Sequence, residues 1–101
     1  MATKTEIKTE TEVKKEPFRP KKYKVILLND DVTTMEFVVA ILVKIFEKSV
    51  QDAVDIMFKV HKIGSGVAGI YIKEIAKTKQ NAVIKAAKEA NFPLQCIIEE
   101  E

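Results

Sequence analysis

The sequence predicts an α/β (α+β) fold, a two-layer sandwich in which three helices cover one face of a three-stranded antiparallel sheet in the order βααβαβ. Three observations predict it. Apolar residues recur at helical intervals in three stretches, three short apolar or β-branched runs have the length of strands, and 101 residues with 47% hydrophobic content suit one small core. Helices on one face of such a sheet would bury their apolar stripes in a single core.

The first strand and the first helix follow each other closely. Residues 23–28 (YKVILL) are mostly apolar and are followed by the turn-forming residues 29–31 (NDD). A helix is expected from Thr33, because Thr33 and Glu36 have the spacing of a capping box. Its inward stripe recurs at helical intervals and consists of Met35, Val38, Val39, Leu42, Ile45 and Phe46.

The second half of the domain repeats these signals. Ser49 and Asp52 have the capping spacing again, so a second helix is expected to begin there and to end at the glycines Gly64 and Gly66. Pro93 is expected to end a third helix. The later elements are then a β-branched strand at residues 67–75, a helix at residues 78–91 and an apolar strand at residues 94–98.

The chain divides into a tail and a domain. Residues 1–22 alternate Lys, Glu and Thr with few apolar side chains, a composition that cannot bury enough apolar surface to fold. We therefore expect a disordered N-terminal tail at residues 1–22 and one folded domain at residues 23–101.

Composition also bounds the location and the partners. The longest apolar stretch, residues 37–43, is far short of the ~20 residues that span a bilayer, so we expect no membrane partner and a cytoplasmic location. The single cysteine, Cys96, lies in an apolar run, which predicts a buried thiol in a reducing compartment. The net charge of +2 comes without a long basic block, so nucleic acid is not an expected partner.

A few polar residues are left unexplained by the core pattern. Asn29, Asp30 and Asp31 follow the first strand, and His61 shares a helix face with Met57. If the two helices pack as a hairpin, these groups could ring one end of an apolar pocket. Carboxylate, amide and neutral imidazole groups accept hydrogen bonds, so they suit an ammonium beside a hydrophobic side chain. The expected walls of the pocket are Met35, Val38, Met57 and Val60.

Residues 23–38 (YKVILLNDDVTTMEFV) resemble the signature segment of the ClpS family, the adaptors of the Clp protease. Matches to the later motifs of the family follow in order and spacing, and together they cover roughly residues 23–99. These matches are Val60-His61, Gly64, the region of Gly69, residues 74–79 (EIAKTK) and residues 93–96 (PLQC).

The resemblance implies a function. A ClpS-like protein is an adaptor of the N-end rule (N-degron) pathway, not an enzyme and without a cofactor. It binds substrates whose first residue is Leu, Phe, Tyr or Trp and delivers them to the N-terminal domain of a ClpA- or ClpC-type AAA+ unfoldase, which works with ClpP. A monomer suits this role, and the N-terminal tail takes part in delivery.

The resemblance also implies roles for particular residues. Asn29, Asp30, Asp31 and His61 would hold the substrate's α-ammonium and first peptide group. The side-chain pocket would be formed by Thr33, Met35, Val38, Met57, Val60 and Leu94, with Met35 acting as a gate against β-branched residues. Glu74 and Lys79 would dock on the unfoldase. Val32 and Thr34 depart from the Tyr and Pro of many family members, which affects the expected rigidity of the loop.

Simpler interpretations exist for each feature. An Asn-Asp-Asp run before a helix is often only a turn and cap, methionines are usually core residues, and exposed charges are usually only solvated.

Other functions have weaker support in the sequence. A metal site of Asp30, Asp31 and His61 lacks a recognised ligand spacing, and a Cys96–His61 nucleophilic pair lacks an activating charge. A different binding module, the C-terminal domain of the ribosomal stalk protein, would need a glycine- and lysine-rich helix that is absent.

Overall fold

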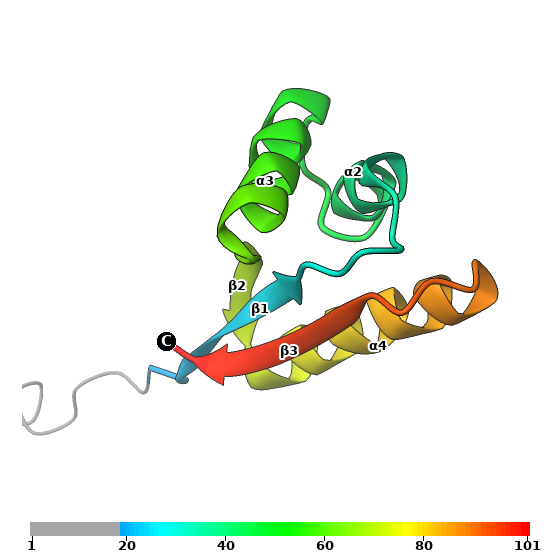
Figure 1. Ribbon diagram of the computed structural model, residues 1–101. Coiled ribbons are helices and arrows are strands. Elements are labelled where there is room, and N and C mark those ends of the chain that lie inside the picture. Colours follow the sequence, from blue (N-terminus) through cyan, green and yellow to red (C-terminus); the bar gives the residue numbers. More distant parts are fainter. Residues whose placement is uncertain (1–18) are drawn as a thin grey trace, which may run out of the picture.

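The computed structural model describes residues 19–101, and its elements follow the expected order βααβαβ (Figure 1). None of the helices within residues 19–101 is long and apolar enough to cross a membrane. The expected tail falls mainly on residues 1–18, which lie outside the described residues. The elements are β1 (Lys22–Leu28), α2 (Met35–Lys44), α3 (Val50–Ile63), β2 (Ser65–Ile72), α4 (Lys73–Glu89) and β3 (Gln95–Glu100).

The sheet has the strand order β2-β1-β3, and both pairings are antiparallel. Its central strand turns alternate residues to opposite faces. Leu27 is fully buried in the core that the helices cover, whereas Ile26 pairs with Val67 and Ile97 on the other face, where both partners are exposed. The helices therefore cover one face of the sheet, as the sequence predicts.

All three helices contribute to one hydrophobic core. No polar or charged residue of the described chain is buried in it. Since each helix has a single buried stripe, packing of these stripes in one core, with α3 on β2, α4 on the whole sheet and α2 on α3, fixes the positions of the helices relative to the sheet. The buried helical residues are Val38, Ile41 and Leu42 from α2, Ala53, Met57 and Val60 from α3, and Ala76, Val83 and Ala87 from α4.

The predicted boundaries are wrong most clearly at the start of α2 and between β2 and α4. Helix α2 is capped by Thr34, whose hydroxyl accepts from the Phe37 N–H at 3.2 Å, and not by Thr33, whose hydroxyl is bound to Asp30. Strand β2 covers residues 65–72 and α4 begins at Lys73, five residues earlier than expected. The N-cap of α4 is Ile72, which makes no side-chain capping bond, so the sequence carries no capping signal there.

Smaller differences concern the other strands. Lys22 belongs to β1, where it pairs with Ile72, although we expected it in the tail. Strand β3 begins at Gln95, so Leu94 precedes it, and it continues to Glu100 beyond the expected end at residue 98. Strand ends are set by pairing with β1, and this pairing is not visible in the apolar pattern alone.

Candidate binding pocket

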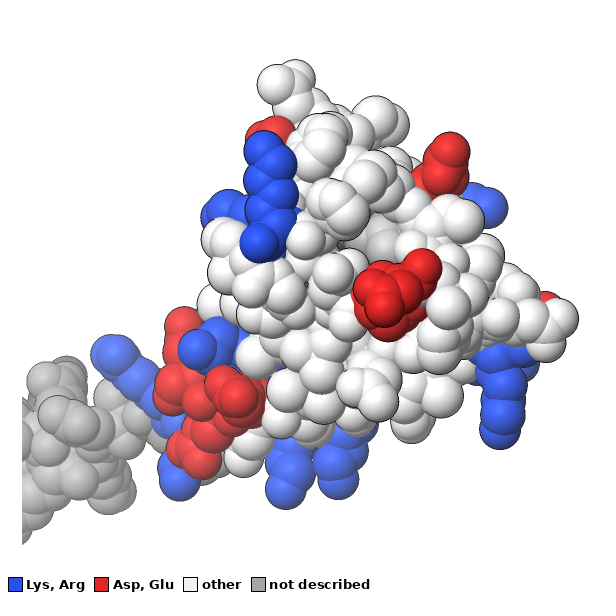
Figure 2. Space-filling model, viewed as in Figure 1, with Lys and Arg blue, Asp and Glu red and all other residues white. Residues whose placement is uncertain are grey.

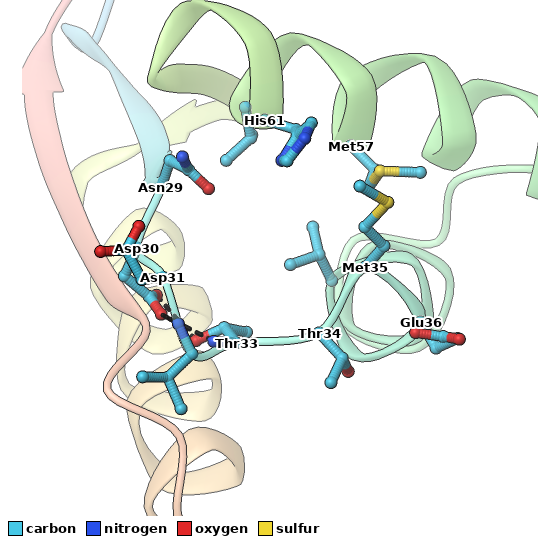
Figure 3. A pocket seen from close by; sticks show the side chains of 12 residues that line it. Asn29, Asp30, Asp31, Thr33, Thr34, Met35, Glu36, Met57 and His61 are labelled. Carbon is cyan, nitrogen blue, oxygen red and sulfur yellow. Dashed lines mark hydrogen bonds between the residues drawn. The ribbon is translucent and has the colours of Figure 1, made fainter.

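A cavity of about 420 Å³ lies where the loop after β1 meets the start of α2 and the last turns of α3 (Figure 3). Two stretches of the chain that are far apart in sequence, residues 29–38 and 57–61, form its walls, so it exists only in the folded domain. The lining residues are Asn29, Asp30, Asp31, Val32, Thr33, Thr34, Met35, Glu36, Val38, Met57, Val60 and His61.

The end of α3 places His61 across the cavity from Asn29. The helix stops at Gly64, which has a φ of 104° and donates its N–H to the Val60 carbonyl at 3.0 Å. The Gly64 carbonyl in turn accepts from the Asn29 N–H at 2.9 Å, so the start of the loop is tied to the end of the helix. Figure 3 shows the Asn29 amide and the His61 ring both directed into the same hollow.

Asp30 organises the loop. One of its carboxylate oxygens accepts from the N–H groups of Val32 at 2.8 Å and Thr33 at 2.7 Å, and the other accepts from the Thr33 hydroxyl at 2.7 Å. Partial burial raises the pKa of Asp30, but these hydrogen bonds outweigh burial and hold the pKa below its ordinary value. Asp30 therefore stays ionised at neutral pH and fixes the turn that leads into α2.

The apolar wall of the cavity comes from the two helices. Val38, Met57 and Val60 are buried, and Met57 is only 7% exposed. Met35 stands opposite Met57 and is 39% exposed, so it lies at the mouth of the cavity (Figure 3). Since methionine is flexible, this pair can adapt to the shape of a guest side chain.

The charge of the site is negative. Asp30, Asp31 and Glu36 line the cavity, and no Lys or Arg does. Figure 2 shows an acidic patch beside a hollow in an otherwise uncharged area, over the loop that follows β1. The C-terminal end of α3, which also faces the site, carries the negative end of the helix dipole. A cation attached to an apolar group matches this combination of charge and surface.

Comparison with known proteins gives the family. The family model described as "ATP-dependent Clp protease adaptor protein ClpS" matches residues 18–97. The chain belongs to the ClpS family. It is thus a member of a family of Clp protease adaptors, and the resemblance inferred from its motifs is confirmed.

Similar ClpS proteins cover most of this chain. The ATP-dependent Clp protease adapter protein ClpS of Campylobacter jejuni subsp. doylei is 55% identical over 95 residues, which are 94% of this chain and 99% of the relative. The ClpS of Treponema denticola is 58% identical over 80 residues, which are 79% of each chain. The structure of Agrobacterium tumefaciens ClpS2 bound to L-phenylalaninamide matches with a TM-score of 0.79 and 42% identity, over 82% of this chain and 100% of the other.

The fold brings together the residues expected at a ClpS ligand pocket, with one exception. Asn29, His61 and every other predicted pocket residue except Leu94 line the cavity. Leu94 is buried in the core just before β3 and is not part of the cavity wall. The sequence interpretation missed Val32, Thr34 and Glu36, which line the cavity because they belong to the same loop and first helical turn as Thr33 and Met35.

The two residues that the ClpS resemblance associates with docking lie elsewhere, on α4. Glu74 is exposed in the first turn of this helix. Lys79 is partly buried, and its ammonium donates to the Ile45 carbonyl at 2.6 Å. The two side chains therefore differ in availability, since only Glu74 points freely to solvent.

The alternative chemical sites find no support in the geometry. Cys96 is buried in the core, and burial raises the pKa of its thiol to about 12, so it is protonated at neutral pH and poorly nucleophilic. Within residues 19–101, no group of three or more His, Cys, Asp or Glu side chains is arranged to hold a metal ion.

Proposed function

We propose that this adaptor captures proteins by a bulky hydrophobic N-terminal residue and delivers them to a Clp AAA+ unfoldase, which passes them to ClpP for degradation. The composition of the pocket is the main observation that supports this proposal. It joins hydrogen-bond acceptors and negative charge at one end to an apolar wall at the other. A polypeptide's first residue is the group that offers an ammonium and a hydrophobic side chain on the same carbon atom.

The α-ammonium is recognised at the Asn29–His61 end of the pocket. A free α-amino group has a reference pKa of ~7.7–8.0, so at neutral pH it is largely protonated and offers three N–H donors. The Asn29 amide oxygen and a neutral His61 nitrogen can accept two of them. Asp31 makes no hydrogen bond to another described residue, so its carboxylate is available for the ammonium or the first peptide group.

Asp30 acts in a different way from Asp31. Three of the roughly four acceptor positions of a carboxylate are already used in holding Val32 and Thr33. Its main contribution is therefore to shape the loop and to add negative charge, with one position left for the ligand.

The side chain of the first residue enters the apolar part of the pocket. Burial of a Leu or Phe side chain contributes ~1.5–3 kcal/mol, and each charge-assisted hydrogen bond a similar amount, before the costs of association. Met35 at the mouth would exclude β-branched residues, which leaves Leu, Phe, Tyr and Trp as the preferred ligands. Thr33 belongs to the rim, whereas Leu94 does not line the cavity and would act on it only through the packing of the core.

The ligand of the similar structure agrees with this proposal. L-phenylalaninamide, bound to the Agrobacterium protein, has a free α-amino group, a benzyl side chain and an amide in place of the carboxylate. These are the chemical features of the first residue of a polypeptide. The same combination fits the acceptors and the apolar wall of the present pocket.

Delivery uses other parts of the chain. Glu74 and Lys79 help dock the adaptor on the N-terminal domain of a ClpA- or ClpC-type unfoldase, and residues 1–22 engage the same partner. The adaptor works as a cytoplasmic monomer. It neither uses ATP itself nor requires a cofactor, because binding involves no covalent change.

A fluorescence anisotropy titration tests the proposal. We expect labelled peptides that begin with Leu or Phe to bind with micromolar or tighter affinity, a Val peptide to bind much less, and acetyl-Leu to show no binding. His61→Ala should weaken Leu-peptide binding by about tenfold or more, since one charge-assisted hydrogen bond is lost. Equal binding of free and acetylated Leu peptides would contradict the proposal.

A neighbouring residue supplies the control. Lys62 follows His61 on α3 but is exposed and does not line the pocket. Lys62→Ala should bind the Leu peptide as the wild type does. A similar loss in both variants would mean that the histidine acts through the stability of α3 and not through the ligand.

A further inference from the structure

Two adjacent residues of α4 make long-range hydrogen bonds from their side chains. The Gln80 amide donates to the Cys96 carbonyl of β3 at 2.8 Å, and the Lys79 ammonium donates to the Ile45 carbonyl at 2.6 Å. Both bonds are partly buried. Helix α4 is thus tied to the sheet by Gln80 and to the end of α2 by Lys79.

The acceptor of Lys79 is the C-cap residue of α2. The last carbonyls of a helix have no partner within the helix, and a cation near them also interacts favourably with the negative end of the helix dipole. Lys79 therefore caps α2 from another element. Its ammonium also lies 5.7 Å from the centre of the Tyr71 ring, which packs near Phe46 just beyond α2.

Apart from the Lys79 bond, α2 and α4 are separated by an apolar groove of about 260 Å³. The residues that line it include Phe37, Ile41 and Ala86. At the start of α2, the Phe37 ring contacts Phe92, with centroids 4.9 Å apart. On this side, α2 is held mainly at its two ends, by Phe37–Phe92 and by Lys79–Ile45.

The same helix carries one wall of the ligand pocket. Met35, Glu36 and Val38 all belong to α2 and all line the cavity, facing Met57 and His61 of α3. A short helix moves nearly as a rigid body, so a shift at its C-terminal end also moves this wall relative to α3.

We infer that Lys79 is a positioning residue for the ligand pocket, because its bond to Ile45 fixes the α2 wall that carries Met35 and Val38. This inference rests on the proposed function, since the pocket must bind N-terminal residues for the effect to be measured. It also means that loss of Lys79 impairs substrate capture in the adaptor alone, before any unfoldase is present.

The test compares Lys79→Met with Gln80→Met, using a fluorescein-labelled Leu peptide and no unfoldase. Each variant loses one long-range bond from α4, but only Lys79→Met loses the bond to α2. We expect Lys79→Met to weaken Leu-peptide binding by about threefold to tenfold and Gln80→Met by less than about twofold, as for coupling through packed elements. Hydrogen exchange of the last turn of α2 should become faster only in Lys79→Met.

The outcomes are distinct. The inference is overturned if folded Lys79→Met binds the Leu peptide as the wild type does, or if Gln80→Met weakens binding equally. If Lys79→Met does not fold, Lys79→Ala, which also removes the donor, is measured against the same thresholds. A wild-type protein that binds free and acetylated peptides equally would refute the proposed function instead, so the two failures can be told apart.

Discussion

The ligand pocket and the surface of α4 show two different ways in which polar residues are used in this fold. In the pocket, Asn29 and His61 come from separate segments and face one hollow. On α4, Glu74 and Lys79 are close in sequence, yet Glu74 is exposed and Lys79 is bound to the Ile45 carbonyl. The shared position of Asn29 and His61 therefore supports a shared role in the pocket. The short sequence distance between Glu74 and Lys79 does not establish a shared role on α4.

A second contrast lies within the pocket. Asp30 makes three hydrogen bonds to its own loop, whereas its neighbour Asp31 makes none to other described residues. The Asp30 carboxylate shapes the loop, and we propose that the Asp31 carboxylate contacts the ligand. Substitutions can separate these roles, because an organising residue affects stability and a contacting residue affects binding.

The largest expected effect concerns the methionine pair. Met57 belongs to both the core and the pocket, whereas Met35 is at the mouth. Met57→Ala should lower the free energy of unfolding by about 2–5 kcal/mol, since it leaves a cavity in the core. Met35→Ala should lower it by less than about 1 kcal/mol, because the side chain is already partly exposed. Urea unfolding measures both changes.

Peptide binding also distinguishes the two methionines. Met35→Ala should increase the affinity for a Val peptide relative to a Leu peptide, because it removes the side chain that we propose as the gate. An equal loss of stability in the two variants would contradict the assignment of Met57 to the core and Met35 to the mouth.

A smaller effect is expected at Asp30. Asp30→Asn should lower the free energy of unfolding at pH 7 by about 1 kcal/mol, less than for a buried charged hydrogen bond, because the loop is partly exposed to solvent. The pKa of Asp30 is lower in the folded state, so its stabilisation is present above its unfolded pKa of about 3.9 and is lost as pH falls through the folded pKa. The difference between wild type and Asp30→Asn should therefore shrink below about pH 4.

Asp31→Asn provides the matched control for this measurement. It removes a neighbouring charge that holds no loop N–H, so its stability at pH 7 should stay close to that of the wild type, while its affinity for a Leu peptide falls. A difference between Asp30→Asn and wild type that grows as the pH falls would contradict the role of the ionised Asp30 carboxylate.

The sequence predicted the fold well where local signals agree with tertiary packing. Ser49 and Gly64 mark the ends of α3 correctly, because the Ser49 side chain caps the helix and Gly64 adopts a left-handed conformation. The start of α4 was misplaced, since Ile72 gives no capping signal and the β-branched Ile75 resembles a strand residue. Local preference was overridden there by the packing of Ala76 into the core.

The site could be predicted only in part, because the spacing of residues in the sequence suggests that Asn29 and His61 lie close together but does not establish it. His61 shares a face with Met57 by helical periodicity, but its position opposite Asn29 requires the bond between Asn29 and Gly64. The organising role of Asp30 and the inward bond of Lys79 could not be predicted, because both depend on backbone groups whose positions are set by tertiary structure.

The smallest expected effect concerns Glu74, and it tests the contrast with Lys79 directly. Glu74→Ala removes an exposed charge, so the free energy of unfolding should change by less than about 0.5 kcal/mol and Leu-peptide binding should stay the same. Binding to the N-terminal domain of the unfoldase should weaken by no more than about fivefold, since exposed charge pairs contribute 0.2–1 kcal/mol. Glu89→Ala, at the far end of α4, should leave both kinds of binding unchanged. If Glu74→Ala weakened peptide capture as Lys79→Met is expected to do, α4 would act on the pocket as a whole, and the distinction between an outward Glu74 and an inward Lys79 would be lost.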